Sequence, residues 1–237
     1  MIDKNYFTEQ LKLNGLTLNE EAIKRFEIYA DELIEYNKKV NLTAITAPDE
    51  ICVKHFIDSL MLTKFVDVTG EKKLCDIGTG AGFPGVALLI YNPDLKVTLF
   101  DSVNKKLEFI RQLLPKLGLT AQIVNCRAED AGKDPKFREK FDIATARAVA
   151  QLNQLAEYSI PLVSVGGLFC PLKAPLTDEE KQRGFSAAAQ LGCKNIRTEK
   201  YTVSAENPRE IVICEKIRHT DKAFPRPCAK ISKNPLG

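Results

Sequence analysis

Apolar residues recur along the first part of this chain with the period of a helix. Between residues 19 and 39 they fall every three or four positions and so share one helical face: Ile23, Phe26, Ala30 and Leu33. Asn19 precedes the stretch and is a favoured N-cap residue. A second helix is expected to begin near Pro48 and to run through residues 55–60. The pattern therefore predicts a helical segment over residues 1–70.

Beyond residue 70, short apolar runs alternate with segments of helical period. Strand-like runs occupy residues 73–77, 96–101, 121–125, 141–145 and 168–173, and helical patterns occupy residues 84–91, 104–114 and 177–191. Such alternation indicates a parallel sheet covered by helices on both faces. The runs at 196–203 and 211–217 predict a closing antiparallel hairpin. The expected fold class is α/β, with a Rossmann-like, mostly parallel sheet over residues 71–217.

A glycine-rich turn joins the first strand of this sheet to its first helix. Residues 74–85 read Leu-Cys-Asp-Ile-Gly-Thr-Gly-Ala-Gly-Phe-Pro-Gly. Glycines let a ligand approach the backbone, and a helix that follows them aims N–H groups at the crevice. Asp101 ends the next strand, 23 residues after Gly78, close to the ~20 expected of a carboxylate that binds ribose hydroxyls. The stretch therefore predicts a nucleoside-binding crevice.

The spacing of the glycines distinguishes between nucleoside cofactors. A dinucleotide fingerprint that starts at Gly78 and Gly80 needs its third glycine at Phe83. Residues 76–82 instead resemble motif I of methyltransferases that use S-adenosylmethionine (SAM). The alternative, a glycine turn that holds no ligand, is disfavoured by Asp101 at the end of the neighbouring strand.

The ends of the third and fourth strands carry further candidates. Ligands of open α/β sheets bind beyond the carboxyl ends of the strands, and Ala128, Glu129 and Arg147 follow such ends here. Glu129 is expected either to accept from an adenine amino group or to cap the next helix. Arg147 is expected to meet a ligand carboxylate, a nucleic-acid phosphate or, alternatively, a partner in a surface ion pair.

His55 and Asp58 lie three residues apart and share a helix face. The pair is open to two interpretations, a polar pair that lines a site or a solvated helix surface. The spacing alone favours the solvated surface.

Composition narrows the functional classes. The 237 residues are 44% apolar and 27% charged, as in soluble globular proteins, and no apolar run reaches the ~18–20 residues of a membrane span. The start of the chain lacks the layout of a secretion signal, so a cytoplasmic protein is expected. Separately, we expect the chain to act as a monomer. The seven cysteines contain no C-x-x-C pair, and there are two histidines, so neither a disulfide framework nor a metal site is predicted.

Positive charge gathers at the end of the chain. Residues 216–237 contain six lysines or arginines and one acid, Asp221. Three of the cations, Arg226, Lys230 and Lys233, are interleaved with prolines. Because proline interrupts a helix, we expect residues 218–237 to form an extended basic tail suited to phosphate contacts. The alternative is a solvated end whose basic residues serve solubility.

Taken in order, several motifs resemble the RsmG (GidB) family of bacterial methyltransferases. They are Asn41-Leu42-Thr43, His55-x-x-Asp58-Ser59-Leu60, residues 76–85, Arg127-Ala128-Glu129, Ala146-Arg147-Ala148, Phe224-Pro225-Arg226 and Asn234-Pro235-Leu236. The resemblance covers nearly the whole chain. It implies a SAM-dependent enzyme that methylates N7 of a guanine in the 530 loop of 16S ribosomal RNA, with the rRNA or the small ribosomal subunit as partner.

The resemblance also implies roles for individual residues. Cofactor contacts are expected in the glycine loop and at the strand ends, at Gly78, Gly80, Phe83, Asp101, Ala128, Glu129 and Arg147. RNA contacts are expected at Asn41, Thr43, His55, Asp58, Ser59, Lys173, Arg226, Lys230 and Lys233. The chain departs from the family pattern at Ala174, where glycine is usual, and at residues 227–229, Pro-Cys-Ala.

The expected chemistry needs few catalytic groups. Guanine N7 carries an in-plane lone pair and attacks a methyl group without prior deprotonation, so no general base and no metal are predicted. Orientation of the reactants alone can supply ~7–11 kcal/mol. Two other functions stay open, a SAM-dependent methyltransferase of another RNA, a protein or a small molecule, and a nucleotide-binding module without catalysis.

Overall fold

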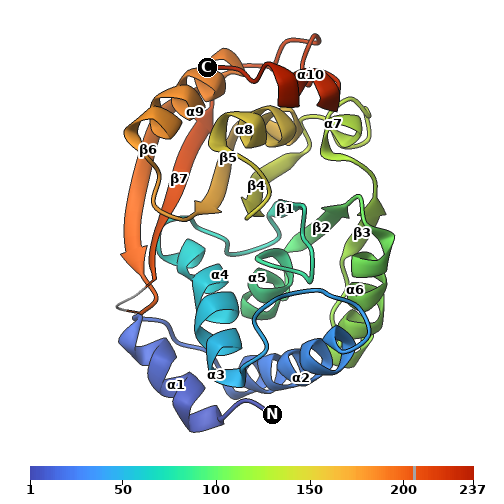
Figure 1. Cartoon of the computed structure of the whole chain (residues 1–237), viewed down its shortest axis with the longest axis vertical. Helices are drawn as coiled ribbons and strands as arrows, with labels where there is room; N and C mark the ends of the chain where they lie inside the picture. Colours follow the sequence, from blue (N-terminus) through green and yellow to red (C-terminus); the bar gives the residue numbers. More distant parts are fainter. Residues whose placement is uncertain (205–206) are drawn as a thin grey trace.

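A twisted sheet runs through the middle of the molecule, and helices cover both of its faces (Figure 1). The computed structural model describes residues 1–204 and 207–237. Within them the sheet has the strand order β3-β2-β1-β4-β5-β7-β6. Its strands are β1 Lys73–Ile77, β2 Lys96–Asp101, β3 Gln122–Asn125, β4 Phe141–Arg147, β5 Val163–Lys173, β6 Cys193–Thr202 and β7 Pro208–Lys216.

The first five strands are parallel, and β7 and β6 close the sheet in the antiparallel sense. This arrangement confirms the predicted Rossmann-like sheet with its closing hairpin. β4 and β5 extend beyond the predicted runs, since β4 continues to Arg147 and β5 begins at Val163. The carboxyl ends of β1, β2, β3 and β4 therefore lie along one edge of the sheet, where the glycine turn begins.

The helices form two layers. On one face lie α5 Gly85–Tyr91, α6 Asn104–Leu117 and the N-terminal helices, which are α1 Lys4–Leu13, α2 Glu20–Asn37, α3 Pro48–Ile51, η1 Cys52–Ile57, α4 Asp58–Leu60 and η2 Met61–Lys64. On the other face lie α7 Ala128–Ala131, α8 Leu152–Ser159, η3 Ile160–Leu162 and α9 Asp178–Gln190. Helix α8 was not predicted from the sequence, because its eight residues give too short a periodic pattern.

Strand β1 shows how alternation assigns side chains to the two layers. Successive residues of a strand point to opposite faces, and Leu74 joins the core beneath α5 while Cys75 and Ile77 join the core on the other face. All three are buried. Asp76 therefore points toward α5, where its carboxylate meets the helix N-terminus.

The N-terminal helices share their core with the sheet. Asn19 caps α2 as predicted, since its side-chain oxygen accepts from the backbone N–H of Ala22 at 2.8 Å. Aromatic rings of α1, α2 and η1 pack together, with Phe26 and Phe56 4.7 Å apart between ring centroids. The division of the chain at residues 70 and 217 stays a prediction.

The expectation of an extended, non-helical tail is wrong. Residues Cys228–Lys233 form helix α10, and Ile231 on it is fully buried. The prolines at 225 and 227 precede this helix and Pro235 follows it, so none interrupts its hydrogen bonds. Figure 1 shows α10 beside α7, near α8. Among the described residues, no helix is both long and apolar enough to cross a membrane.

Candidate functional site

The glycine turn after β1 is tied to the end of β2. The backbone N–H of Gly80 donates to the Asp101 carboxylate at 2.9 Å, and that of Thr79 donates to the carbonyl of Phe100 at 3.0 Å. Gly78 and Gly80 have φ values of 66° and 59°, a backbone region that glycine adopts without strain. The turn therefore leaves β1 in a shape that presents backbone atoms beside Asp101.

Close packing explains one of the loop glycines. A Cβ on Gly82 would lie 2.6 Å from the hydroxyl oxygen of Tyr29. That hydroxyl donates to the carbonyl of Ala81 at 2.6 Å, and the Tyr29 ring stacks on Phe83 with centroids 5.1 Å apart. Helix α2 thus supports the loop from behind. Phe83 is 5% exposed and belongs to this packing.

A buried carboxylate fixes the other end of the loop. Asp76 accepts from the Thr79 hydroxyl at 2.7 Å and from the backbone N–H of Gly85 at 2.9 Å, both through Oδ2. Its Oδ1 has no partner among the described residues. Burial raises the pKa of Asp76 to about 6 from an ordinary value of 3.8. Although Asp76 stands in the glycine motif, no role was predicted for it from the sequence.

A pocket of about 190 Å³ opens at the carboxyl ends of β1, β2 and β3. Its walls include a group predicted from the sequence, Gly78, Asp101, Ala128 and Glu129, and a group that was not, Ser102, Val149, Tyr158 and Cys228. Tyr158 lies on α8 and Cys228 on α10, and their side chains meet at 3.7 Å. The carboxyl-terminal segment, for which we predicted RNA contacts, therefore forms part of this pocket wall.

The pocket suits an adenosyl group. Each oxygen of the Asp101 carboxylate accepts one backbone N–H, from Gly80 at 2.9 Å and from Val103 at 2.8 Å. A carboxylate oxygen has two lone pairs, so both can still accept ribose hydroxyls. Glu129 lies in the first turn of α7, is 6% exposed, and its side chain makes no hydrogen bond among the described residues. Its acidic side chain is suited to an adenine amino donor.

A second group of predicted residues gathers where β4 ends. The Arg147 guanidinium donates to Asp58 Oδ2 at 3.0 Å, to His55 Nδ1 at 2.9 Å and to the carbonyl of Lys54 at 3.0 Å. It also lies over the Phe83 ring, 4.9 Å from the centroid. The Arg147 side chain is 14% exposed and that of Asp58 is 3% exposed. Neither a surface ion pair for Arg147 nor the solvated helix face favoured for His55 and Asp58 is correct.

Hydrogen bonds determine which ring nitrogen of His55 carries the proton. Since Arg147 donates to Nδ1, the ring donates through Nε2 to the Thr43 hydroxyl at 2.9 Å. Burial, reinforced by the positive charge of Arg147, lowers the pKa of His55 to about 3. The imidazole is therefore neutral at pH 7, and both of its nitrogens are occupied.

Residues distant in the sequence complete this network. Asp58 Oδ1 accepts from the Tyr201 hydroxyl at 2.8 Å, and Arg209 lies 3.5 Å away. Both residues come from the closing hairpin, and no local pattern marked them. Ser59, in contrast, is fully buried and donates to the His55 carbonyl at 2.6 Å. Its side chain therefore stabilises the helix and does not face a pocket.

A second pocket, of about 400 Å³, lies beside Arg147 at the end of β4 and Ala148, which follows it. Its lining includes His55, Asp58, Arg147, Lys173, Ala174, Glu180 and Arg209. Lys173 Nζ donates to the carbonyl of Ala150 at 2.8 Å and pairs with Glu180 at 3.0 Å. Ala174, one of the departures from the family pattern, therefore lies in a pocket wall.

Val149 separates the two pockets. A Cβ on Gly78 would lie 2.7 Å from Val149 Cγ2, so this side chain rests directly on the glycine turn. Lys173 holds the neighbouring carbonyl of Ala150 from the opposite side. Residues 148–150 thus stand between the pocket beside Asp101 and the pocket beside Arg147.

The remaining residues for which we predicted RNA contacts lie outside both pockets. Asn41 is exposed, in a segment that Asn37 holds through the backbone N–H groups of Leu42 and Thr43, at 2.7 and 3.0 Å. Lys230 and Lys233 are exposed on α10. Arg226 is not available to a phosphate, because its Nε and Nη2 bind the two oxygens of Glu157 at 2.8 and 2.6 Å. Glu157 is itself fully buried.

Comparison with known proteins identifies relatives over nearly the full length. The model of the GidB family, rRNA small subunit methyltransferase G, matches residues 22–212. A ribosomal RNA small subunit methyltransferase G from Lactobacillus johnsonii is 43% identical, over 97% of this chain and 98% of the relative. One from Desulfitobacterium hafniense is 45% identical, over 94% of this chain and 92% of the relative.

Solved structures of methyltransferases share the fold. A SAM-dependent O-methyltransferase from Thermotoga maritima aligns with a TM-score of 0.57 and 16% identity, over 80% of this chain and 73% of that one. A methyltransferase from Pyrococcus furiosus aligns with a TM-score of 0.57 and 15% identity, over 82% of this chain and 99% of that one. At this level of identity the likeness concerns the fold.

Proposed function

This chain belongs to the rRNA small subunit methyltransferase G family, and on that premise we propose that it methylates N7 of a guanine in 16S rRNA, in the 530 loop. S-adenosylmethionine is the methyl donor, and S-adenosylhomocysteine is released. The observation that carries the proposal is the hydrogen bond from the Gly80 backbone to Asp101 at 2.9 Å, which joins the glycine turn and the ribose-binding carboxylate at one pocket.

The residues beside Asp101 hold the cofactor in this proposal. Asp101 accepts the ribose hydroxyls, and Glu129, in the first turn of α7, receives the adenine amino group. The backbone of Gly78 and Gly80 lies against the remaining part of the SAM molecule. When bound, SAM supplies an electrophilic methyl group on a sulfonium centre. Tyr158 and Cys228 close the wall of the same pocket, so α8 and α10 exclude water from the nucleoside.

The pocket beside Arg147 receives the target nucleotide. Four basic side chains line it, Lys54, Arg147, Lys173 and Arg209, together with the acids Asp58 and Glu180. Basic groups attract the phosphates of RNA, and Asn41 and Thr43 belong to the segment held next to His55. Val149 lines the pocket beside Asp101 and Ala148 lines the pocket beside Arg147, so in this proposal the methyl group and the guanine approach each other along the edge of residues 148–149.

Methyl transfer to guanine N7 requires that the two reactants be oriented and requires no proton transfer beforehand. Guanine N7 has a free lone pair in the ring plane, so no side chain needs to act as a base. His55 is neutral and both of its nitrogens are hydrogen-bonded, which suits a residue that fixes Arg147 in place. Preorganised groups of this kind act by holding the reactants in line.

The RNA partner extends the site beyond the two pockets. Lys230 and Lys233 on α10 are exposed and are proposed to contact phosphates, whereas Arg226 serves the fold through Glu157. We place the reaction in the cytoplasm, on 16S rRNA or the small ribosomal subunit, with the chain acting as a monomer.

Methyl transfer from radiolabelled SAM tests the proposal. The purified chain is incubated with small ribosomal subunits from a strain that lacks this modification, or with 16S rRNA from them. Digestion to nucleosides is expected to give labelled 7-methylguanosine, mapped by mass spectrometry to the 530 loop. Label in another nucleoside, in another RNA or in ribosomal protein would contradict the proposal and favour the alternative substrates.

A further inference from the structure

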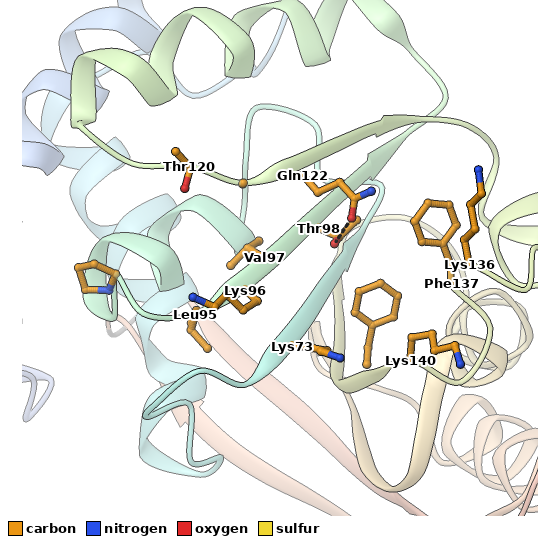
Figure 2. Close-up of a pocket in the computed structure, with 13 residues that line it drawn as sticks. Lys73, Leu95, Lys96, Val97, Thr98, Thr120, Gln122, Lys136, Phe137 and Lys140 are labelled. Carbon is orange, nitrogen blue, oxygen red and sulfur yellow. Dashed lines mark hydrogen bonds between the residues drawn. The ribbon is translucent and has the colours of Figure 1, made fainter.

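A basic hollow lies at the opposite end of the sheet from both pockets. It has a volume of about 460 Å³ and is formed at the amino ends of β1 and β2, the start of β3 and the segment that precedes β4. Figure 2 shows lysine side chains around it, and four of its lining residues are Lys73, Lys96, Lys136 and Lys140. The proposed reaction uses none of them.

Most of this positive charge is unneutralised. Lys96 lies 3.5 Å from Glu71, whereas the ammonium groups of Lys73, Lys136 and Lys140 have no ion-pair partner among residues 1–204 and 207–237. The nearby Asp142 carboxylate accepts the backbone N–H of Lys73 at 2.8 Å and not its side chain. Like charges around one hollow repel each other, and an anion within it removes that repulsion.

The hollow also offers an aromatic ring and amide donors. Phe137 is half-buried and is held edge-on by Phe100, at 5.1 Å and 90°. Gln122 accepts from the Thr98 hydroxyl at 3.2 Å through its side-chain oxygen, as Figure 2 shows. Its amide nitrogen has no partner among the described residues. A partly exposed ring beside lysines is the combination on which nucleic-acid bases stack while their phosphates are neutralised.

Strand β2 relates this hollow to the cofactor pocket. Lys96 begins the strand and Asp101 ends it, so the two sites are about 17 Å apart at ~3.3 Å per residue. A distance of this size corresponds to a few nucleotides of extended RNA. The hollow and the pocket beside Asp101 therefore lie at the two ends of the same strand, close enough for one RNA molecule to contact both ends of the sheet.

We propose that the hollow formed by Lys73, Lys96, Lys136, Lys140 and Phe137 binds a single-stranded segment of the RNA substrate. The lysines contact its phosphates, and one base stacks on Phe137. This inference rests on the proposed function for the identity of the strand. It assigns a second RNA contact to a face of the sheet that lies away from the methyl-transfer site.

Binding of fluorescein-labelled hexauridylate across a salt series tests the inference. The double variant Lys136→Ala/Lys140→Ala is expected to weaken binding about tenfold and to reduce the log–log salt slope by about 1.4, because each phosphate contact to a single strand contributes ~0.7. Phe137→Leu is expected to weaken binding about tenfold with an unchanged slope. The matched control, Lys194→Ala/Lys200→Ala, removes two exposed lysines of β6 and leaves both quantities unchanged.

Methyl transfer separates this inference from the proposed function. For 16S rRNA the lysine variant is expected to raise KM about tenfold and to keep kcat and SAM affinity. If wild type methylates the rRNA but the lysine variant retains both the wild-type KM and the wild-type salt slope, the inference is overturned while the function stands. If the variants change hexauridylate binding as expected but the wild type methylates no rRNA, the proposed function is contradicted and the inference about the hollow is supported. Binding of AMP as tight as that of hexauridylate overturns the assignment to an RNA strand.

Discussion

Arg147 donates a hydrogen bond of 2.9 Å to Nδ1 of His55, although 92 residues separate them in the chain. The contact joins the end of β4 to the π-helical turn η1 and determines which nitrogen of His55 carries the proton. Through Asp58 the same guanidinium reaches Tyr201 in the closing hairpin. One arginine thus connects three separate segments at the rim of the proposed substrate pocket.

Substitution of Arg147 is expected to affect stability and rate differently. Arg147→Ala leaves the buried Asp58 carboxylate with Tyr201 and the more distant Arg209, so the free energy of unfolding falls by about 3–5 kcal/mol. Arg147→Lys keeps the charge and recovers most of this stability. It does not recover methyl transfer, because an ammonium group cannot reproduce the planar fork. Urea unfolding and single-turnover transfer measure the two effects, and a lysine variant as fast as wild type would contradict the positioning role.

His55 is expected to make the protein sensitive to acid. Its pKa is about 3 in the folded protein, against an ordinary value of 6.5. Between these values the unfolded chain binds the proton more readily, so stability is full above pH 6.5 and is lost as the pH falls toward 3. The contribution from pH 7 to pH 5 is about 2 kcal/mol.

Asp76 acts in the opposite sense over part of that range. Its pKa is about 6 when folded, against 3.8, so the folded state gains a proton and relative stability as the pH falls through 6.

Comparison of wild type with His55→Gln by urea unfolding at pH 7 and 5 isolates the contribution of His55 to the pH dependence of stability. The variant is expected to gain stability relative to wild type at pH 5. The control is His219→Gln, at a side chain that is 83% exposed and lies 2.6 Å from the Glu139 carboxylate, and an identical pH dependence of stability for wild type and His55→Gln is the contrary result.

Asp101→Ala is expected to weaken SAM binding. The variant loses the proposed ribose acceptor and the anchor of the Gly80 N–H, a cost of about 1.5–3 kcal/mol or roughly 10- to 150-fold in affinity. Calorimetry on the folded variant measures it. Asp142→Ala is the control, since it also removes a carboxylate that accepts a backbone N–H, but at the start of β1. Equal SAM affinity in the Asp101 variant and wild type would remove Asp101 from the site.

Arg226→Ala is expected to destabilise the whole protein. It leaves Glu157, which is fully buried, with a single backbone hydrogen bond from residue 226, and breaking a buried pair costs about 3–5 kcal/mol. Because Cys228 lines the proposed cofactor pocket beside Asp101, SAM affinity is expected to fall as well. Arg183→Ala breaks an exposed pair with Glu179 and should barely change stability. Urea midpoints that coincide for both variants would show that the pair with Glu157 contributes nothing.

The exposed lysines of α10 are expected to contribute to RNA affinity. Lys230→Ala/Lys233→Ala should reduce the salt slope of RNA binding by about 1.4, at ~0.7 per phosphate contact. SAM affinity should stay unchanged, since neither side chain lines the cofactor pocket. Binding to 16S rRNA across a salt series measures the slope. A slope equal to that of wild type would assign these lysines to solubility alone.

The arrangement of the sheet was predictable from the sequence, and so was the proximity of the glycine turn to Asp101. Alternating apolar runs specify which elements form, and the order of strands and helices leaves few topologies. Gly78, Gly80 and Asp101 lie together as predicted, since a glycine turn after a buried strand and an acid at the next strand end are neighbours in any parallel sheet of this kind. Such features depend on short stretches of chain, and pattern therefore predicts them.

The surroundings of His55, Asp58 and Arg226 follow from tertiary contacts. Their spacing suggested a solvated helix face and a free basic tail, but His55 and Asp58 are buried and Arg226 is largely covered, each by a partner far along the chain: Arg147, Tyr201 and Glu157. A buried charge is stable only when a specific counter-charge or hydrogen bond meets it. Because that partner can come from any element that packs nearby, the periodicity of one segment does not reveal it, and the assembled fold does.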